Sequence, residues 1–241
     1  MSPAKSKKGD STKWIVSRGT FLGTSLLAVV LGIVLVTLGW QSGHRQVVLL
    51  PPTTTPPTTS PGIVVSGTSI GFPRAPITIV AYSDFQCHFC EQFANTIESQ
   101  IDATYIQTGK VRFVYKHLIS FGEESQLAAE ASEAAAEQNQ FWPFHDALMR
   151  LQLSNAASDL SLEKLRAIAQ QLGLNMTQFD AGLTSGKFKA KVASDDAEGR
   201  ATGITGIPAF FVNGIKAPDG VSTSFEEFQK VLDAELARLG K

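Results

Sequence analysis

The spacing of apolar residues predicts strands and helices from about position 77 onward. Residues 77–83 (ITIVAYS) are mostly β-branched or aromatic and follow two prolines, a pattern typical of a buried strand. From position 87 to Gly109 the pattern changes, because large apolar residues then recur at every fourth position, as on one face of a helix. Residues 111–115 (VRFVY) predict a second strand. This part of the chain therefore has the order strand, helix, strand.

Helical patterns dominate the stretch from about position 120 to 202. Gly, Asn and Ser residues divide it into segments with apolar residues at helical spacing. We expect helices at 127–138, 141–153, 162–172 and 187–201. The sequence thus predicts a helical domain inserted over about residues 120–202.

The end of the chain returns to a strand pattern. Residues 209–212 (AFFV) predict a strand, the Asn-Gly pair at 213–214 is a strong hairpin signal, and residues 215–217 supply the partner strand. A final helix should begin at Ser224, because a Glu follows three residues later, as in a capping box. The complete order is β-α-β, helical insertion, β-β-α, which defines an α/β fold.

An uncharged apolar stretch precedes this region. Residues 19–43 contain no charged side chain and are long enough to cross a bilayer as a helix. Residues 1–18 contain five Lys or Arg, so this basic segment should stay in the cytoplasm and the rest be exported. A cleaved signal peptide is the alternative, but the stretch exceeds a usual signal core and lacks a clean small-x-small cleavage site. We predict one uncleaved transmembrane anchor at 19–43.

Residues 44–70 should link this anchor to the folded domain. Positions 51–62 read PPTTTPPTTSPG, which has neither helix nor strand spacing and is rich in a residue that favours extended backbone. This Pro/Thr-rich linker is expected to hold a domain of residues 71–241 away from the membrane. The domain would then lie in the periplasm or an equivalent extracytoplasmic space.

The composition indicates a globular domain without affinity for nucleic acid. Of the 241 residues, 43% are hydrophobic and 18% are charged, which is enough apolar material for a core. The formal net charge is −1, and the excess of basic residues is confined to the N-terminal segment. We therefore expect no nucleic-acid partner.

The only two cysteines of the chain, Cys87 and Cys90, lie between the first predicted strand and the first predicted helix. Their spacing is that of a dithiol that can switch between open and bridged forms. A purely structural disulfide would close so short a loop that it would stabilise the fold little. A zinc site would need two more ligands and has no second cysteine pair to supply them. We predict a redox-active disulfide, no metal and no other cofactor.

The two thiols should differ in reactivity. At the first turn of a helix, unpaired N–H groups and the positive end of the dipole favour a thiolate, so Cys87 is predicted to be an exposed nucleophile. Cys90, one turn further in, should be the shielded resolving thiol. Protonated His88 would also favour the thiolate, whereas the charges of Asp84 and Glu91 would raise the pKa of Cys87. The balance of these effects does not follow from the sequence.

Three further segments carry a family resemblance: residues 83–87 (SDFQC), 141–146 (FWPFHD) and 203–214 (GITGIPAFFVNG). With the order of elements, they make residues 71–241 resemble the thioredoxin fold with a helical insertion. The chain is similar to DsbA-like thiol-disulfide oxidoreductases, particularly the membrane-tethered exported members. The resemblance implies that Pro208 is cis and lies against the dithiol, with a substrate-binding residue, Ile207, before it.

The resemblance also implies partners and one point of difference. It implies thiol-containing exported proteins as substrates and reoxidation by a membrane partner of the DsbB or vitamin K epoxide reductase type. Family members commonly have Pro after the first cysteine, and strongly oxidising ones have His before the second. Here His88 and Phe89 occupy these positions. These two residues should modulate the dithiol, and its redox potential cannot be transferred from the family.

Two other functions remain open at this point. A reductase or isomerase could use the same fold, and a peptide-binding module or chaperone could carry an incidental dithiol. His117 and His145 are expected to be packed, hydrogen-bonded residues rather than catalytic ones. Glu123 and Glu124 are candidates for proton transfer to the resolving thiol, although a solvated loop is the default expectation.

Overall fold

The computed structural model describes residues 62–152 and 160–241, so the predicted anchor at 19–43 and most of the predicted linker lie outside it. Within the described ranges, no helix has the length and apolar character needed to cross a bilayer.

In chain order the elements are β1 (Val64–Ser66), β2 (Ser69–Gly71), β3 (Ile77–Ser83), α2 (His88–Phe93), η1 (Ala94–Glu98), α3 (Ser99–Ile101), η2 (Asp102–Ile106), β4 (Val111–His117), α4 (Glu123–Ala136), α5 (Phe141–Gln152), α6 (Leu162–Gln171), α7 (Met176–Ser185), α8 (Lys189–Ala201), β5 (Ala209–Val212), β6 (Ile215–Lys216), η3 (Val221–Thr223) and α9 (Phe225–Arg238).

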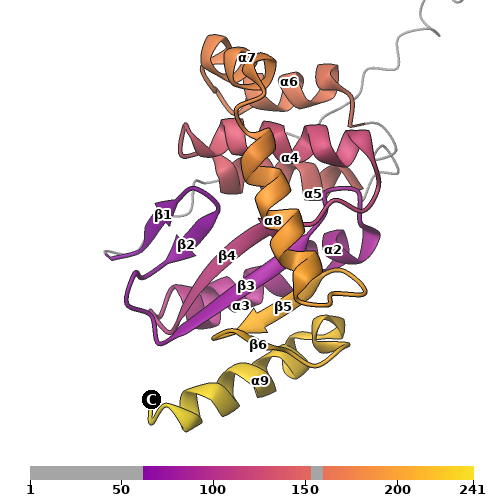
Figure 1. Ribbon diagram of the computed structural model, residues 1–241. Helices are drawn as coiled ribbons and strands as arrows, with labels where there is room; N and C mark the ends of the chain where they lie inside the picture. The colour runs from indigo at the N-terminus through magenta and orange to yellow at the C-terminus, as the bar shows by residue number, and fades with distance from the viewer. Residues whose placement is uncertain (1–61, 153–159) are drawn as a thin grey trace, which may run out of the picture. The chain divides into compact units, whose positions relative to one another are not determined.

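The strands of the described region form one mixed sheet with the order β1-β2-β4-β3-β5-β6 (Figure 1). β3 and β4 are parallel, and the other neighbouring pairs are antiparallel. The predicted strands at 77–83 and 209–212 are confirmed, and the one at 111–115 extends to His117. Because β3 and β4 are central, β3 ends inside the domain and delivers the residues that follow it to a protected position.

Two short strands precede the predicted start of the domain. β1 and β2 form a hairpin, and β2 also pairs with β4, so residues 64–70 belong to the sheet and not to the linker. Strands of three residues are too short for an alternating pattern to be recognised in the sequence. Gly71 has φ 128°, and a Cβ there would lie 2.6 Å from the Val111 carbonyl oxygen, so the close approach of β2 to β4 requires glycine.

The helix that follows the dithiol is continuous but not uniform, since two π-helical segments, η1 and η2, interrupt α2 and α3. A repeat of exactly four residues drifts around an α-helix of 3.6 residues per turn, whereas wider π turns keep it on one face. Phe93, Ile97, Ile101 and Tyr105 are accordingly all buried. The helix that the spacing predicted is confirmed, and it ends at Ile106, shortly before Gly109.

The helical insertion consists of α4 to α8, of which α4 to α7 gather at one end of the sheet while α8 runs back across it (Figure 1). The predicted helices correspond to α4, α5, α6 and α8, whereas α7 was not predicted. Its sequence, MTQFDAGLTS, has few large apolar residues and contains Gly182. That glycine is needed for packing, because a Cβ there would lie 2.8 Å from the Phe188 ring. The apolar signal of α7 is limited to Met176, Phe179 and Leu183, which recur at helical spacing and pack against the core.

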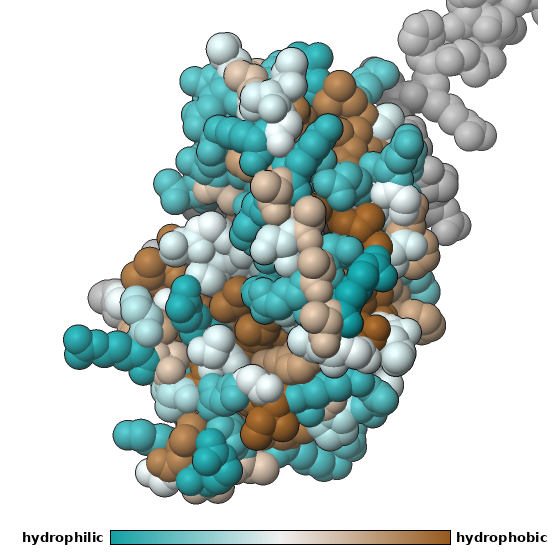
Figure 2. All heavy atoms as spheres, in the orientation of Figure 1, coloured by the Kyte–Doolittle hydropathy of each residue, from teal (hydrophilic) through white to brown (hydrophobic). Residues whose placement is uncertain are grey.

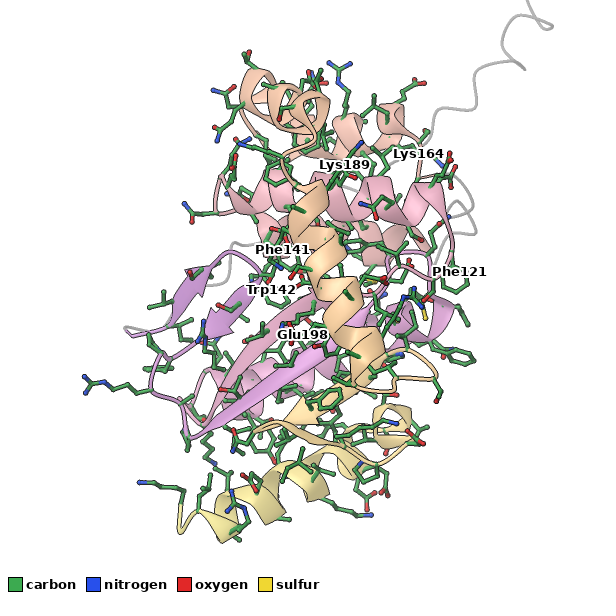
Figure 3. All side chains as sticks on the ribbon, viewed as in Figure 1. Phe121, Phe141, Trp142, Lys164, Lys189 and Glu198 are labelled. Atoms are coloured by element: carbon green, nitrogen blue, oxygen red, sulfur yellow. The ribbon has the colours of Figure 1, made fainter. Side chains whose placement is uncertain are left out.

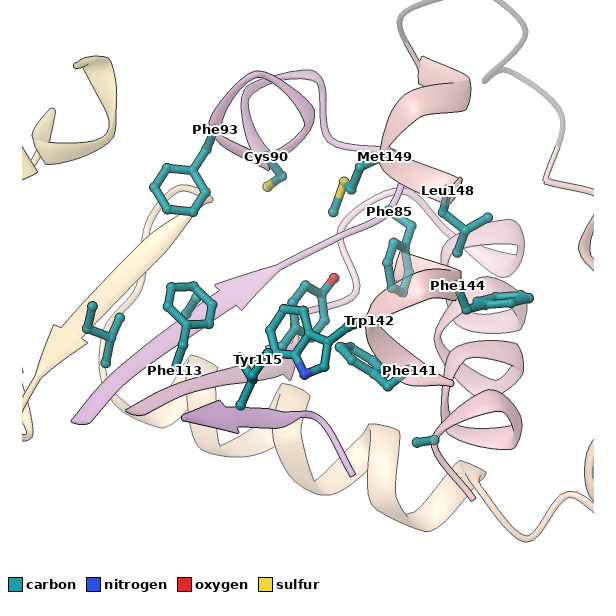
Figure 4. Packing of buried hydrophobic residues seen from close by; sticks show 14 of the residues in the cluster. Phe85, Cys90, Phe93, Phe113, Tyr115, Phe141, Trp142, Phe144, Leu148 and Met149 are labelled. Carbon is teal, nitrogen blue, oxygen red and sulfur yellow. The ribbon is translucent and has the colours of Figure 1, made fainter. Parts of the chain in front are cut away.

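Aromatic side chains join the insertion to one face of the sheet (Figure 4). Tyr115 of β4 lies 5.3 Å from Phe141 of α5 and stacks on Phe85 at 5.4 Å, measured between ring centroids. Phe113 contacts Trp142 at 5.9 Å in an edge-to-face arrangement. Such pairs add about 0.5–1.5 kcal/mol each beyond their burial. They fix α5 against the strands that carry the dithiol.

The opposite face of the sheet is covered by α8, which crosses β4 (Figure 1). The contact is close at Gly199, where a Cβ would lie 2.5 Å from Leu118 Cδ1 and 2.8 Å from Tyr82 Cδ1. Next to it, Glu198 accepts a hydrogen bond of 2.8 Å from the Tyr82 hydroxyl and pairs with Lys116 (Figure 3). α8 thus joins the insertion to the back of β3, away from the dithiol.

Candidate active site

The two cysteines lie where the chain leaves β3 and enters α2. Cys87 is the N-cap of α2, and its N–H donates to the Asp84 carbonyl oxygen at 3.1 Å. The Asp84 carboxylate fixes the same turn by accepting from Gln86 N at 2.8 Å and Ser120 N at 2.7 Å. The turn therefore presents the Cys87 sulfur to the first N–H groups of the helix, as the sequence predicted.

The Cys87 sulfur has two close polar neighbours. It accepts a hydrogen bond from the Cys90 N–H at 3.3 Å, and its own thiol points to the Ile207 carbonyl oxygen at 3.6 Å. The prediction that Cys87 is exposed was wrong, because only 3% of the residue is accessible to solvent. The loop that carries Ile207 covers the sulfur, so a disulfide of another protein must displace or replace this contact to reach it.

The environment moves the acidities of the two thiols in opposite directions. The hydrogen bond from the Cys90 thiol contributes most to lowering the pKa of Cys87. Burial opposes that effect, the N–H groups of Cys90 and Phe89 support it, and the Asp84 charge raises the pKa slightly. Burial, followed by the interaction with Cys87, raises the pKa of Cys90 well above its ordinary value. The balance left open by the sequence therefore favours a Cys87 thiolate.

Cys90 lies on the inner side of α2 and is 1% exposed. Its sulfur points into the aromatic core between Phe93 and Met149 (Figure 4). The Ser83 hydroxyl hydrogen-bonds to it and partly offsets the rise of its pKa. Cys90 is therefore shielded, as predicted, and Ser83 is a polar neighbour that sequence reasoning had not singled out.

His88 and Phe89, the residues between the cysteines, point outward. His88 Nδ1 lies 3.1 Å from Glu91 Oε2, and Glu91 is itself buried. The imidazole therefore faces a carboxylate that was expected to act on Cys87. Phe89 is 67% exposed and lines a groove. The backbone N–H of Phe89, in contrast, is one of the groups that lower the pKa of Cys87.

A groove of about 660 Å³ lies beside the dithiol. Phe89 and Gln92 line it on one side, and the segment Thr205–Phe210 and the turn after β6 line it on the other. The Ile207–Pro208 peptide bond is cis, as the family resemblance implied, and both residues contribute to the groove. On the face shown in Figure 2, apolar side chains form small patches among polar ones. Phe89 is an exposed apolar side chain that lines a groove.

A polar network joins the turn before Cys87 to the helical insertion. The Ser125 hydroxyl lies 2.7 Å from Asp84 Oδ1, and Gln86 Nε2 donates to Glu124 Oε2 at 3.0 Å. Glu124 thus belongs to the first turn of α4 and supports the active-site turn, contrary to the expected solvated loop, whereas Glu123 is exposed. Ser125 is far from the dithiol in sequence, so no local pattern could have indicated this contact.

The two histidines expected to be structural are both buried. His117 Nε2 lies 3.0 Å from Glu133 Oε1, and His145 Nδ1 lies 3.1 Å from Asp146 Oδ1. Each belongs to a cluster with metal-ligand atom types, which are His117, Glu133 and Asp195 in one and Glu98, His145 and Asp146 in the other. Lys191 pairs with Glu133 and Asp195, so a lysine already supplies the positive charge in the first cluster. Neither cluster includes a cysteine.

The fold and the site together define the class of protein. A family model described as thioredoxin matches residues 64–234, and the chain belongs to this family. A CxxC pair at the start of a helix, opposite a cis-proline loop and with an inserted helical domain, places it in the class of DsbA-like thiol-disulfide oxidoreductases.

A disulfide bond formation protein among the relatives agrees with this class, and a solved structure shares the fold. The probable disulfide bond formation protein D of Bacillus anthracis is 30% identical over 175 residues, which cover 70% of this chain and 78% of that protein. The structure of oxidised BdbD from Bacillus subtilis shares the fold, with a TM-score of 0.64 and 24% identity over 71% of this chain and 93% of the other. The Na(+)/H(+) antiporter NhaA 3 of Salinispora tropica is 35% identical over 145 residues, but these cover 59% of this chain and only 21% of the antiporter.

Proposed function

We propose that the chain is an exported, membrane-anchored enzyme that introduces disulfides into thiol-containing exported proteins by dithiol-disulfide exchange through Cys87 and Cys90. One observation carries this proposal: the Cys87 sulfur lies at the start of α2, accepts the Cys90 N–H at 3.3 Å and faces the Ile207 carbonyl at 3.6 Å. A thiol in this position is ionised more easily than a free thiol, and only a thiolate exchanges with disulfides.

The exchange would proceed in two steps. A substrate thiolate attacks the Cys87 sulfur of the Cys87–Cys90 disulfide, and Cys90 leaves with the electron pair. A second substrate thiolate then attacks the substrate sulfur of the mixed disulfide, which releases the oxidised substrate and a Cys87 thiolate. The lowered pKa of Cys87 makes it a good leaving group and stabilises the reduced enzyme, so it favours oxidation of the substrate.

The position of the groove beside the dithiol suits it to bind the substrate. An extended substrate segment would lie between Phe89 and the Ile207–Pro208 loop, with the Ile207 backbone available for hydrogen bonds. Replacement of the 3.6 Å contact between Cys87 and Ile207 by a substrate would also open the buried sulfur to attack. In this proposal, substrate binding and access to Cys87 are the same event.

The cellular setting is the remaining part of the proposal. Residues 19–43 would anchor the chain with a cytoplasmic N-terminus, and disulfides persist in the compartment on the other side. A membrane reoxidase of the DsbB or vitamin K epoxide reductase type would return the reduced dithiol to its disulfide. Disulfide bond formation proteins among the relatives support this setting.

The test is oxidation of a reduced two-cysteine peptide by the full, oxidised chain. We expect the wild type to oxidise one equivalent of peptide and Cys87→Ser to oxidise none. In a second reaction, reduced Cys90→Ser is mixed with an activated peptide disulfide, and we expect a stable mixed disulfide between the peptide and Cys87. Ser99→Ala, an exposed position on the same helix, is the matched control and should behave as the wild type. Peptide binding by Cys87→Ser without any turnover by the wild type would instead identify a binding module.

The direction of electron flow needs a separate measurement. Equilibration of the chain with glutathione gives its reduction potential. A value near that of DsbA, about −120 mV, supports the oxidase, whereas one near that of thioredoxin, about −270 mV, would identify a reductase.

A further inference from the structure

A small cavity lies on the inner side of Cys90, away from the sulfur that meets substrate. Its volume is about 10 Å³, at the lower limit for one water molecule. Apolar side chains form much of its wall, but Ser83, Cys90, Glu98, Tyr115 and His145 also line it. The resolving thiol therefore shares an internal space with a carboxyl group, an imidazole and two hydroxyl groups, which come from η1, α5, β3 and β4.

One of these polar groups has no partner. Tyr115 is 2% exposed, and its hydroxyl oxygen has no hydrogen-bond partner of acceptable geometry in the described part of the chain, although the Ser83 hydroxyl lies near enough to act on its pKa. A buried hydroxyl rarely stays unpaired, and a bound water is the usual partner. The cavity is the space next to Tyr115 in which such a water fits. The orphan hydroxyl is thus an observation, independent of the titratable cluster, that points to an internal water beside Cys90.

A chain of polar groups connects the cavity with the surface. A carboxylate oxygen of Glu98, a ring nitrogen of His145 and a carboxylate oxygen of Asp146 lie within 4.8 Å of one another. His145 is 1% exposed and bonds to Asp146 at 3.1 Å, whereas the Asp146 side chain is 44% exposed. Proton-exchanging groups therefore continue from the buried thiol through Glu98 and His145 to solvent.

We propose that Glu98 and His145, acting through one water in this cavity, carry the proton of Cys90 to and from solvent during dithiol exchange. The inference rests on the proposed function and adds residues to it. The sequence segment FWPFHD, which contains His145, then has a chemical role in addition to its role in packing.

The proton balance is the same in both directions. When a substrate thiolate forms a bond to Cys87 and the Cys87–Cys90 bond breaks, Cys90 leaves as a thiolate. The Cys90 thiolate then takes a proton from the cavity water, and Glu98 and His145 return a proton from solvent to that water. In the reverse direction the Cys90 thiol gives its proton to that water and onward to Glu98. Its thiolate then attacks Cys87 and releases the substrate thiolate. The electrons move only between the three sulfur atoms.

The acidities of the cluster suit this role. Although the Glu98 residue is partly exposed, its carboxyl group lies among protein atoms, and this desolvation raises its pKa to about 7 against the opposing effect of His145. Burial acts to lower the pKa of His145, but Glu98 and Asp146 raise it overall. The other charges that act on the pair are Asp102 of η2 and Arg150 of α5. A carboxyl group near neutrality can both accept and donate a proton at the operating pH, which is the condition for efficient proton transfer.

The test follows the reaction of the reduced full chain with 5,5′-dithiobis(2-nitrobenzoate), which releases coloured thiolate twice. The first release reports attack by Cys87, and the second reports attack by Cys90 on the resulting mixed disulfide. The chain has no third cysteine to interfere. We expect Glu98→Gln and His145→Gln to slow the second release at pH 7 by ten-fold or more, in line with the roughly 10²–10⁴-fold contribution of general acid-base catalysis. The first release should stay within about two-fold of the wild type.

The pH profile separates a relay from a packing effect. In the wild type the second release should level off above about pH 7, where Glu98 is ionised, whereas in Glu98→Gln it should keep rising with hydroxide concentration. His117→Gln is the matched control, because His117 is equally buried but does not line the cavity. If His145→Gln fails to fold, partly exposed Glu98 still gives the answer.

The possible failures are distinguishable. Loss of the first release in the wild type would contradict the proposed function, since Cys87 would then not exchange. A normal first release together with an unchanged second release and unchanged pH profile in Glu98→Gln would overturn the relay alone. An equal slowing by His117→Gln would also overturn it, because the effect would then follow from packing.

Discussion

Cys87 and Cys90 are three residues apart in one helical turn, yet the protein treats them oppositely. Cys87 receives the N–H groups at the start of α2, and Cys90 points into an aromatic core with Ser83 as a polar neighbour. Both are almost fully buried, at 3% and 1% exposure, so solvent access does not cause the difference. The hydrogen bond from the Cys90 thiol, supported by N–H groups at the helix start, lowers the pKa of Cys87, while burial, which Ser83 only partly offsets, raises the pKa of Cys90.

The largest expected effect of this contrast is on thiol labelling. We expect iodoacetamide to modify Cys87 of the reduced protein on the order of 100-fold faster than Cys90 at pH 7, because only the thiolate reacts. Mass spectrometry of the two labelled sites over time measures the ratio. In urea the ratio should approach one, which is the control for an effect of the fold. Comparable labelling of both cysteines in the folded protein would remove the proposed division of roles.

The second expected effect is on stability in the two redox states. The reduced protein should unfold at higher urea concentration than the oxidised one at pH 7.5, because the folded state lowers the pKa of Cys87 and the short disulfide loop adds little. The difference between the urea midpoints of the two redox states measures this contribution.

The pH dependence of that difference has a definite sign. A depressed pKa in the folded state contributes stability above the pKa of the unfolded thiol, about 8.5, and this contribution is lost as the pH falls through the lower folded value. The raised pKa of Cys90 acts in the opposite sense above about pH 8.5. The advantage of the reduced state should therefore grow from pH 5 to pH 8. An advantage that shrinks over this range would contradict the lowered pKa of Cys87.

A third, smaller effect concerns Asp84, whose charge opposes ionisation of Cys87. Asp84→Asn should increase the reactivity of Cys87 at low pH by a few-fold, while the loss of hydrogen bonds from Gln86 N and Ser120 N costs about 1–2 kcal/mol of stability. Ser125→Ala is the control, since it removes one hydroxyl contact of Asp84 and keeps the charge. Equal reactivity of the two variants would show that the charge is not the cause.

The sequence predicted the local features of the site and missed those that depend on tertiary contacts. The strand at 77–83, the helix after it and the cis-proline loop follow from periodicity or from the family resemblance. The resemblance placed the Pro208 loop against the dithiol, but it did not indicate that Cys87 is buried there, because that burial depends on a contact between segments 120 residues apart. The same reason applies to Ser125 next to Asp84, and to Glu98 and Tyr115 behind Cys90. α7 was missed because its apolar period consists of only three residues, Met176, Phe179 and Leu183.

The smallest expected effect is that of His88, a residue outside the hydrogen bonds of the Cys87 sulfur. It tests whether those hydrogen bonds are enough to explain the difference between the two thiols. The sequence suggested that its imidazole favours the Cys87 thiolate, but its Nδ1 faces Glu91 Oε2 at 3.1 Å, and the groups that lower the pKa of Cys87 are the Cys90 thiol and the N–H groups of Cys90 and Phe89. These donors remain when the imidazole is removed. His88→Ala should therefore change the rate of Cys87 alkylation at pH 7 by about two-fold or less. His88→Gln, which can still donate to Glu91, separates any effect of the carboxylate left without this partner. A ten-fold slower alkylation in both variants would mean that the imidazole acts on the sulfur directly, and the helix start would then not be sufficient to explain why the two thiols differ.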